Sequence, residues 1–424
     1  MIRIKTLDTI KTFPKSIHIL VAGEAASALS MGIFNFLQIL YYNFIGLSPE
    51  DIGLIFSVGS LFGLAGFFIG PFIKIFGRKN LLCIGVGILS VGIGLNIVFT
   101  SFMILLIGQI IISIGTSLIQ VTELQLLYSY TSDCKECCAY SYKYSASLIA
   151  NAMGILIAGN MDRISYLMNN GYRKLFLVSF IMLFITGVAR YFLLPRDVTI
   201  DVEDGEVKKL LLLSISAVKH DKNIRRFAIL LFLTTLSFSG VGPYNNLILK
   251  LAFGFRNSII SYISFTLTIL SMIGIVLMPT IIEKLGVGKF NLTIFIVAIT
   301  GCLLLSVIDS PYIFIGILIL RCIFTFMIAS SLESLMMSNI DLDRRDVFAS
   351  VKMLVNGLSV ALGNFLGGYI LNRFGYRANY MYGAILLITA VVFFYLRVRM
   401  LLINKTVEKE QCSCHFKKKT MNFK

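Results

Sequence analysis

Four charged side chains stand inside long apolar stretches of the sequence: Glu24, Glu123, Arg321 and Glu333. A charge in the hydrocarbon core of a bilayer is costly, so such residues normally face a cavity or a partner and mark solute or ion pathways. Carboxyl groups in such places can exchange protons, because desolvation disfavours the charged form and two close carboxylates do not both ionise easily. A buried guanidinium can bind an anionic solute or serve as a counter-ion.

Two of the glutamates belong to polar stripes on helical patterns that are otherwise apolar. The first stripe is Glu24, Ser27, Met31, Asn35 and Gln38, and the second is Gln109, Ser113, Thr116, Gln120 and Glu123. Both glutamates lie about seven residues from one end of their stretch, on the order of 10 Å in a helix. We therefore predict proton coupling at Glu24 and Glu123, and a solute cavity lined by Asn35, Gln38, Gln109, Ser113, Thr116 and Gln120.

Further cavity candidates lie in the second half of the chain. In GVGPYNNL, Pro243 can break a helix and free backbone carbonyls. The side chains of Tyr244, Asn245 and Asn246 offer donors and acceptors there, and a role in gating geometry is the alternative. Arg321 is expected to hold a solute or counter-ion. For the glutamates, the alternative to coupling is a structural ion pair or hydrogen bond between helices.

These residues need elements that can span a bilayer. The 424-residue chain is 57% hydrophobic and 14% charged, and a soluble protein could not hide that much apolar surface. Twelve stretches reach the roughly 20 apolar residues that a membrane helix needs. They are 17–45, 50–74, 79–100, 102–130, 143–165, 173–194, 224–250, 257–283, 289–308, 311–338, 346–371 and 377–402. We expect an all-α membrane protein.

The chain repeats itself. Gly77, in GPFIKIFGRKN, and Gly286, in EKLGVGKFN, are 209 residues apart, as are Gly154 in GILIAG and Gly363 in GNFLGG. A GYR motif follows in each half. Both halves have the same expected orientation, so the pattern predicts two parallel, pseudo-symmetric six-helix bundles.

The domain boundaries follow from this repeat. We expect an N-terminal bundle at 1–194, a cytoplasmic linker at 195–223, a C-terminal bundle at 224–402 and a cytoplasmic tail at 403–424. The offset of 209 carries Glu123 to Leu332, next to Glu333, so the two glutamates are near-equivalents. Glu333 is therefore the third candidate for proton coupling.

The net charge of +16 follows membrane topology and does not indicate nucleic-acid binding. Thirty Lys and Arg residues fall in the tails and loops on one side, seven fall on the other side, and Arg321 lies within a stretch. Basic residues concentrate on the cytoplasmic side of membrane proteins. We expect both termini in the cytoplasm and a monomeric, multi-pass protein in the lipid bilayer of the cell membrane.

The turn GPFIKIFGRKN resembles the signature of the major facilitator superfamily, G-x-x-x-D-[RK]-x-G-R-[RK], between helices 2 and 3. It matches at Gly70, Gly77, Arg78 and Lys79, and it has Lys74 at the acidic position. The resemblance implies the two-bundle fold of that family, with helices 1, 4, 7 and 10 around a central cavity. In the family the acid helps to lock the bundles on the cytoplasmic side, and Lys74 is not expected to form that lock.

The eight cysteines do not predict disulfides, because none falls in an outer loop. CKECC and CSCH match no common zinc module, so we expect reduced thiols, no metal and no cofactor. The chain shows no phosphate loop, catalytic triad or HExxH motif, and we expect no enzymatic activity.

The preferred hypothesis is a secondary transporter with alternating access. It would couple protons to movement of a small apolar or amphipathic solute, with efflux favoured. Uptake of a sugar or organic anion by symport or facilitated diffusion is the alternative, supported by Arg321. A transporter-like membrane sensor or lipid-handling protein is the alternative of another class.

Overall fold

The computed structural model describes residues 12–131, 136–161, 171–195, 216–340 and 345–398. These residues are helical and contain no strand. The first bundle consists of α2 (Lys15–Phe44), α3 (Pro49–Gly63), η1 (Leu64–Phe68), α4 (Ile69–Phe76), α5 (Arg78–Val98), α6 (Phe102–Ser129), α7 (Glu136–Gly159) and α8 (Gly171–Leu193). The second consists of α10 (Lys222–Val241), α11 (Asn245–Leu251), α12 (Asn257–Leu285), α13 (Val287–Leu305), α14 (Pro311–Asn339), α15 (Arg345–Phe393) and η5 (Phe394–Val398).

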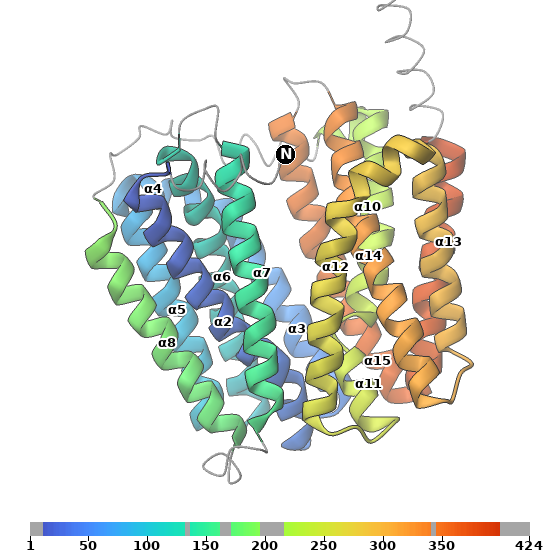
Figure 1. Ribbon diagram of the computed structural model, residues 1–424, viewed down its shortest axis with the longest axis horizontal. Helices are drawn as coiled ribbons and strands as arrows, with labels where there is room; N and C mark the ends of the chain where they lie inside the picture. Colours follow the sequence, from blue (N-terminus) through green and yellow to red (C-terminus); the bar gives the residue numbers. More distant parts are fainter. Residues whose placement is uncertain (1–11, 132–135, 162–170, 196–215, 341–344, 399–424) are drawn as a thin grey trace, which may run out of the picture.

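The twelve predicted spans account for these helices. The span at 50–74 runs through α3, η1 and α4, and the span at 224–250 is split into α10 and α11. The last two spans are joined in α15, which bends at Gly375, where φ is 76° and ψ is −178°. Nine helical segments of the described chain are long and apolar enough to cross a membrane. The predicted all-α, two-bundle architecture is confirmed (Figure 1).

The two turns that revealed the repeat share one backbone conformation. Gly77 has φ 74° and ψ 158°, and Gly286 has φ 76° and ψ 150°. A positive φ of this size favours glycine, which has no Cβ to clash. Each glycine ends one helix and starts the next, so the turns are equivalent in structure as well as in sequence.

The structure describes only part of the turn GPFIKIFGRKN. Gly70 and Lys74 lie within α4, and the side chain of Lys74 is outside the described part of the chain. Arg78 and Lys79 begin α5. The Lys79 ammonium donates to the carbonyl of Leu194 and lies 5.5 Å from the ring centre of Tyr191, so it fastens the end of α8 to this turn.

We name the two ends of the molecule by their glycines: the Gly77 end also carries Gly286, and the Gly53 end also carries Gly368. One apolar core fills the first bundle and continues into α11 and the part of α14 nearest the Gly53 end, through residues such as Tyr244 and Phe314. A second core lies in the second bundle toward the Gly77 end, around Phe290. The apolar cores of the two bundles therefore merge at the Gly53 end.

Candidate functional site

The bundles are closed against each other at the Gly53 end. A Cβ on Gly53 would lie 2.6 Å from the carbonyl oxygen of Asn364, and a Cβ on Gly368 would lie 3.0 Å from the Cα of Gly53. The hydroxyl of Tyr244 donates to the Asn364 carbonyl at the same place. Helices α3 and α15 thus touch backbone to backbone, and any side chain at these glycines would separate them.

A second contact joins α7 and α12 near the same end, where Figure 1 shows the two helices converging. Ser261 packs directly on Gly159, and Tyr262 donates to the Asn160 side chain at 3.1 Å. Asn257, at the start of α12, donates to the Tyr172 hydroxyl at 3.0 Å. The structure is therefore sealed at the Gly53 end by interactions from both pairs of helices.

A charge cluster lies inside the first bundle, toward the Gly77 end. Arg190 on α8 bonds to Glu123 on α6 at 2.8 Å and lies 3.8 Å from Glu24 on α2. Lys143 on α7 lies 3.4 Å from Glu123. We call Glu24, Glu123, Lys143 and Arg190 the N-bundle charge cluster. Glu24 and Glu123, the two acids predicted to couple protons, thus lie around one arginine, and Lys143 is the second cation of the cluster.

The two acids of the cluster differ in burial and pairing. Glu123 and Arg190 are each 1% exposed, and Glu123 has two cationic partners. Glu24 is 18% exposed, accepts a hydrogen bond from Ser147 at 3.1 Å and lies 3.8 Å from Arg190. Glu123 is thus fully buried between two cations. Glu24 is the acid that combines solvent access with weak pairing.

The sequence analysis did not identify Arg190 and Lys143 as site residues, because it counted them among the basic residues that indicate membrane orientation. Arg190 lies within the predicted span 173–194, and Lys143 begins the span 143–165. A tally of every charge within the spans would have found both. Gly23 on α2 leaves the space that the Arg190 side chain occupies, because a Cβ there would lie 2.3 Å from its Nε.

The two polar stripes also meet at Gln38 and Gln109. The Gln38 amide donates to Gln109 at 2.7 Å and to the Tyr42 hydroxyl at 3.0 Å, and Tyr42 donates to Asn96 at 2.7 Å. Gln38 is buried. This chain joins α2, α5 and α6 and satisfies groups that would otherwise be costly in the membrane. Tyr42 and Asn96 were not predicted.

The other stripe residues have varied surroundings. Asn35 and Gln120 are exposed, although their neighbours along the helix are largely buried. Thr116 donates to the carbonyl of Ile112 in its own helix. Ser113 is half-buried, and its hydroxyl lies next to Gly59 of α3. Among the stripe residues, Asn35 and Gln120 are therefore the most accessible to a solute.

The helix break at Pro243 is present between α10 and α11. The three polar residues after it bond to protein groups. Tyr244 belongs to the Gly53-end closure, Asn245 accepts from Tyr380 at 3.0 Å, and Asn246 accepts from Ser264 at 2.9 Å. This geometry supports the gating alternative for Tyr244.

Arg321 lies inside the second bundle and is 1% exposed. Its Nε donates to the sulfur of Cys302 on α13 at 3.0 Å, and its guanidinium lies 5.7 Å from the ring centre of Tyr380. Within the described residues it forms no ion pair, and its Nη2 has no hydrogen-bond partner. The side chain therefore packs between α13 and α15.

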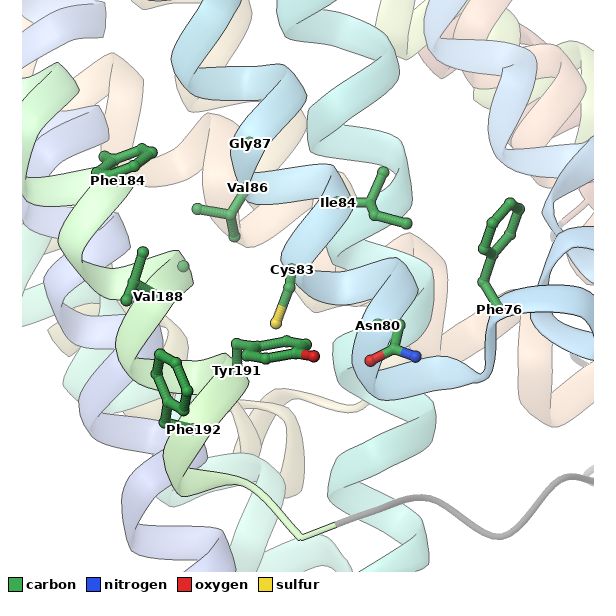
Figure 2. A pocket seen from close by; sticks show the side chains of 11 residues that line it. Phe76, Asn80, Cys83, Ile84, Val86, Gly87, Phe184, Val188, Tyr191 and Phe192 are labelled. Atoms are coloured by element: carbon green, nitrogen blue, oxygen red, sulfur yellow. The ribbon is translucent and has the colours of Figure 1, made fainter.

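Glu333 on α14 forms an ion pair with Lys352 on α15, and the two side chains are 55% and 26% exposed. They line a cavity of about 110 Å³ between α10, α14 and α15. A larger cavity of about 510 Å³ lies between α5 and α8 and is lined by Phe76, Asn80, Cys83, Tyr191 and Phe192 among others (Figure 2). That groove is on the side of the first bundle remote from the second, so it is not on a path between the bundles (Figure 1).

No group of three or more His, Cys, Asp or Glu side chains that could hold a metal occurs in the part of the chain that the structure describes. Cys134, Cys412 and Cys414, and the side chain of Cys137, lie outside it.

Comparisons with known sequences and structures agree with this fold. The family model of the Major Facilitator Superfamily matches residues 20–355. A bacterial homologue of the human lysosomal transporter Spinster, inward-facing and unoccupied, superposes with a TM-score of 0.75 at 13% identity, covering 92% of this chain and 97% of that one. The nucleoside transporter NupG gives 0.71 at 13% identity, covering 91% and 99%.

A bacterial homologue of the iron transporter ferroportin in an inward-facing state also gives a TM-score of 0.71, at 15% identity, covering 90% of this chain and 98% of that chain. No curated protein sequence matches this chain. At these identities the structural likeness concerns the fold.

Proposed function

Because this chain belongs to the Major Facilitator Superfamily, and is thus a multi-pass membrane transporter of a small-molecule solute, we propose that it works by proton-coupled alternating access. The observation that carries the proposal is the N-bundle charge cluster, in which Glu24 is partly exposed and weakly paired while Glu123 is sealed between two cations. Glu24 is the proton carrier, and Glu123, Lys143 and Arg190 hold it in place.

The coupling follows from solvation. With the Gly53 end closed, the Glu24 side chain is 18% exposed and so keeps some access to water. Closing the Gly77 end would remove that water and favour the protonated form. Protonation and closure of the Gly77 end therefore assist each other, which links a proton to the conformational change.

The orientation is part of the proposal. The Gly77 end faces the cytoplasm, because the basic tails and loops lie there. A cysteine introduced at the exposed Val307, between α13 and α14, should react with a membrane-impermeant maleimide added to intact cells. One introduced at Leu285, next to Gly286, should react after permeabilisation. The reverse pattern would contradict the orientation.

The proposed solute is a small amphipathic molecule, because Glu333, Thr235 and Asn356 lie beside apolar side chains in the cavity between α10, α14 and α15. Efflux is the proposed direction. Uptake of a sugar or organic anion rests on Arg321. That residue lies inside the second bundle with Cys302 and Tyr380, which gives uptake less support.

Proton coupling can be tested in vesicles that hold the purified protein and a pH-sensitive dye. Added amphipathic solutes should trigger proton movement through the wild type. Glu24→Gln should reduce this movement to the level of empty vesicles and leave solute exchange intact, because exchange needs no net proton transfer. Glu283→Gln, an exposed acid at the end of α12, is the matched control.

Full solute-driven proton movement in Glu24→Gln would remove Glu24 as the carrier. Solute binding without any flux in the wild type would instead support the membrane-sensor alternative.

A further inference from the structure

The two bundles carry equivalent Glu–Lys pairs. Lys143 and Lys352 are 209 residues apart, the same offset that separates Gly77 from Gly286. Lys143 pairs with Glu123, and Lys352 pairs with Glu333. The repeat therefore places one ion pair between the fourth and fifth helices of each bundle, at corresponding depths toward the Gly77 end.

The surroundings of the two pairs differ. In the first bundle Arg190 and Glu24 complete the cluster and leave Glu123 1% exposed. The residue 209 positions after Glu24 is Leu233. The two GYR motifs are 204 residues apart, and that offset carries Arg190 to Phe394, which is buried.

Two apolar residues thus stand where the first bundle has a second cation and a second acid. Among the described residues, Glu333 pairs with the cation Lys352, and it is 55% exposed.

The cavity at Glu333 has the composition of a binding site for an amphipathic molecule. Thr234, Thr235 and Asn356 supply polar groups, and the Thr235 hydroxyl is hydrogen-bonded to Asn356 at 3.2 Å. The remaining lining is apolar: Leu231, Phe238, Ala329, Leu332, Met336 and Phe348. Sites of this kind hold the apolar body of a ligand and fix its orientation through a few polar groups.

An exposed aromatic pair lies on α7, the helix that carries Lys143. Tyr140 and Tyr144 on α7 are stacked with their ring centres 6.1 Å apart and an angle of 7° between the rings. They are 44% and 45% exposed. Exposed tyrosine faces attract cations.

We propose that the cavity at Glu333 binds the ammonium group of a small amphipathic amine, with Glu333 as its counter-ion and Lys352 as a tethered cation that the amine displaces. The equivalent glutamate in the first bundle accepts two cations, Lys143 and Arg190, so a carboxylate at this position of the repeat can hold a second one. Glu333 is also more exposed than Lys352, which favours a cation over an anion. The amine becomes the transported solute if the proposed function holds.

The test is equilibrium binding to the purified full-length protein by calorimetry at neutral pH. The probes are benzylamine, its neutral analogue benzyl alcohol and its anionic analogue benzoate. Benzylamine should bind, and Glu333→Gln should weaken it by about tenfold or more, because a hydrogen-bonded charge partner is lost. Lys352→Met should strengthen it a few-fold by removing the tethered competitor. Glu283→Gln is again the control.

Equal binding of benzylamine to wild type and Glu333→Gln, or none to the wild type, would overturn the proposal. Benzoate binding that Lys352→Met abolishes would also overturn it, in favour of an anion site. Benzylamine binding is measured at equilibrium, without a proton gradient or flux. Failure here is therefore distinct from failure of proton coupling, which is measured as flux through Glu24 variants.

Discussion

Arg190→Met is expected to destabilise the protein by about 3–5 kcal/mol, the usual effect of removing one partner of a buried ion pair. Arg190 is 1% exposed and is the cation that bridges Glu123 and Glu24. Without it, Glu123 keeps Lys143 alone and Glu24 loses its nearest cation. The measurement is the thermal unfolding temperature of the purified protein in detergent.

Two variants separate this effect from a general loss of packing. Arg373→Met removes an arginine of the same size from an exposed position and should leave the unfolding temperature unchanged. Arg190→Met combined with Glu123→Gln removes both charges of the closest pair and should recover much of the loss. An Arg190→Met protein as stable as the wild type would show that the cluster does not stabilise the bundle.

Gly368→Ala is expected to open the Gly53 end. Its new Cβ would overlap the backbone of α3 at Pro49 and lie 3.0 Å from the Cα of Gly53. Overpacking of this kind costs about 1–3 kcal/mol. This energy would be lost from the closed conformation alone, so the population should shift toward conformers in which α3 and α15 are apart.

Spin labels at Val98 and Val307, both exposed at the Gly53 end, can follow this shift as a longer distance between bundles. Gly316→Ala is the matched control, because a Cβ there meets no atom within 4 Å. An unchanged distance distribution in Gly368→Ala would mean that this contact does not hold the Gly53 end closed.

Much of the fold was predictable because membrane helices carry strong one-dimensional signals. Apolar length marked the spans, and the spacing of Gly77 and Gly286 marked the repeat, which the shared backbone angles of the two turns confirm. The approach of Glu24 to Glu123 was also predictable, since depth and helix face follow from helical geometry.

The partners of these residues were less predictable. Arg190 and Lys143 sit at helix positions where basic residues also serve as topology signals, so their roles depend on which way the side chains turn. Tyr244 follows a helix break, and a break can equally expose polar groups to a solute or bring them against another helix. The backbone contact of Gly53 with Gly368 decides this for Tyr244, and it involves residues over 300 positions apart.

The central claim is that protonation of Glu24 drives the exchange between the two conformations. The most direct measurement is the distance between spin labels at Tyr128 and Leu285, at the Gly77 end, together with the pair at Val98 and Val307. In wild type, a change from mildly alkaline to mildly acidic pH should shorten the first distance and lengthen the second. Glu24→Gln should resemble the wild type at acidic pH and respond to neither condition. A pH response in Glu24→Gln equal to that of the wild type would contradict the claim.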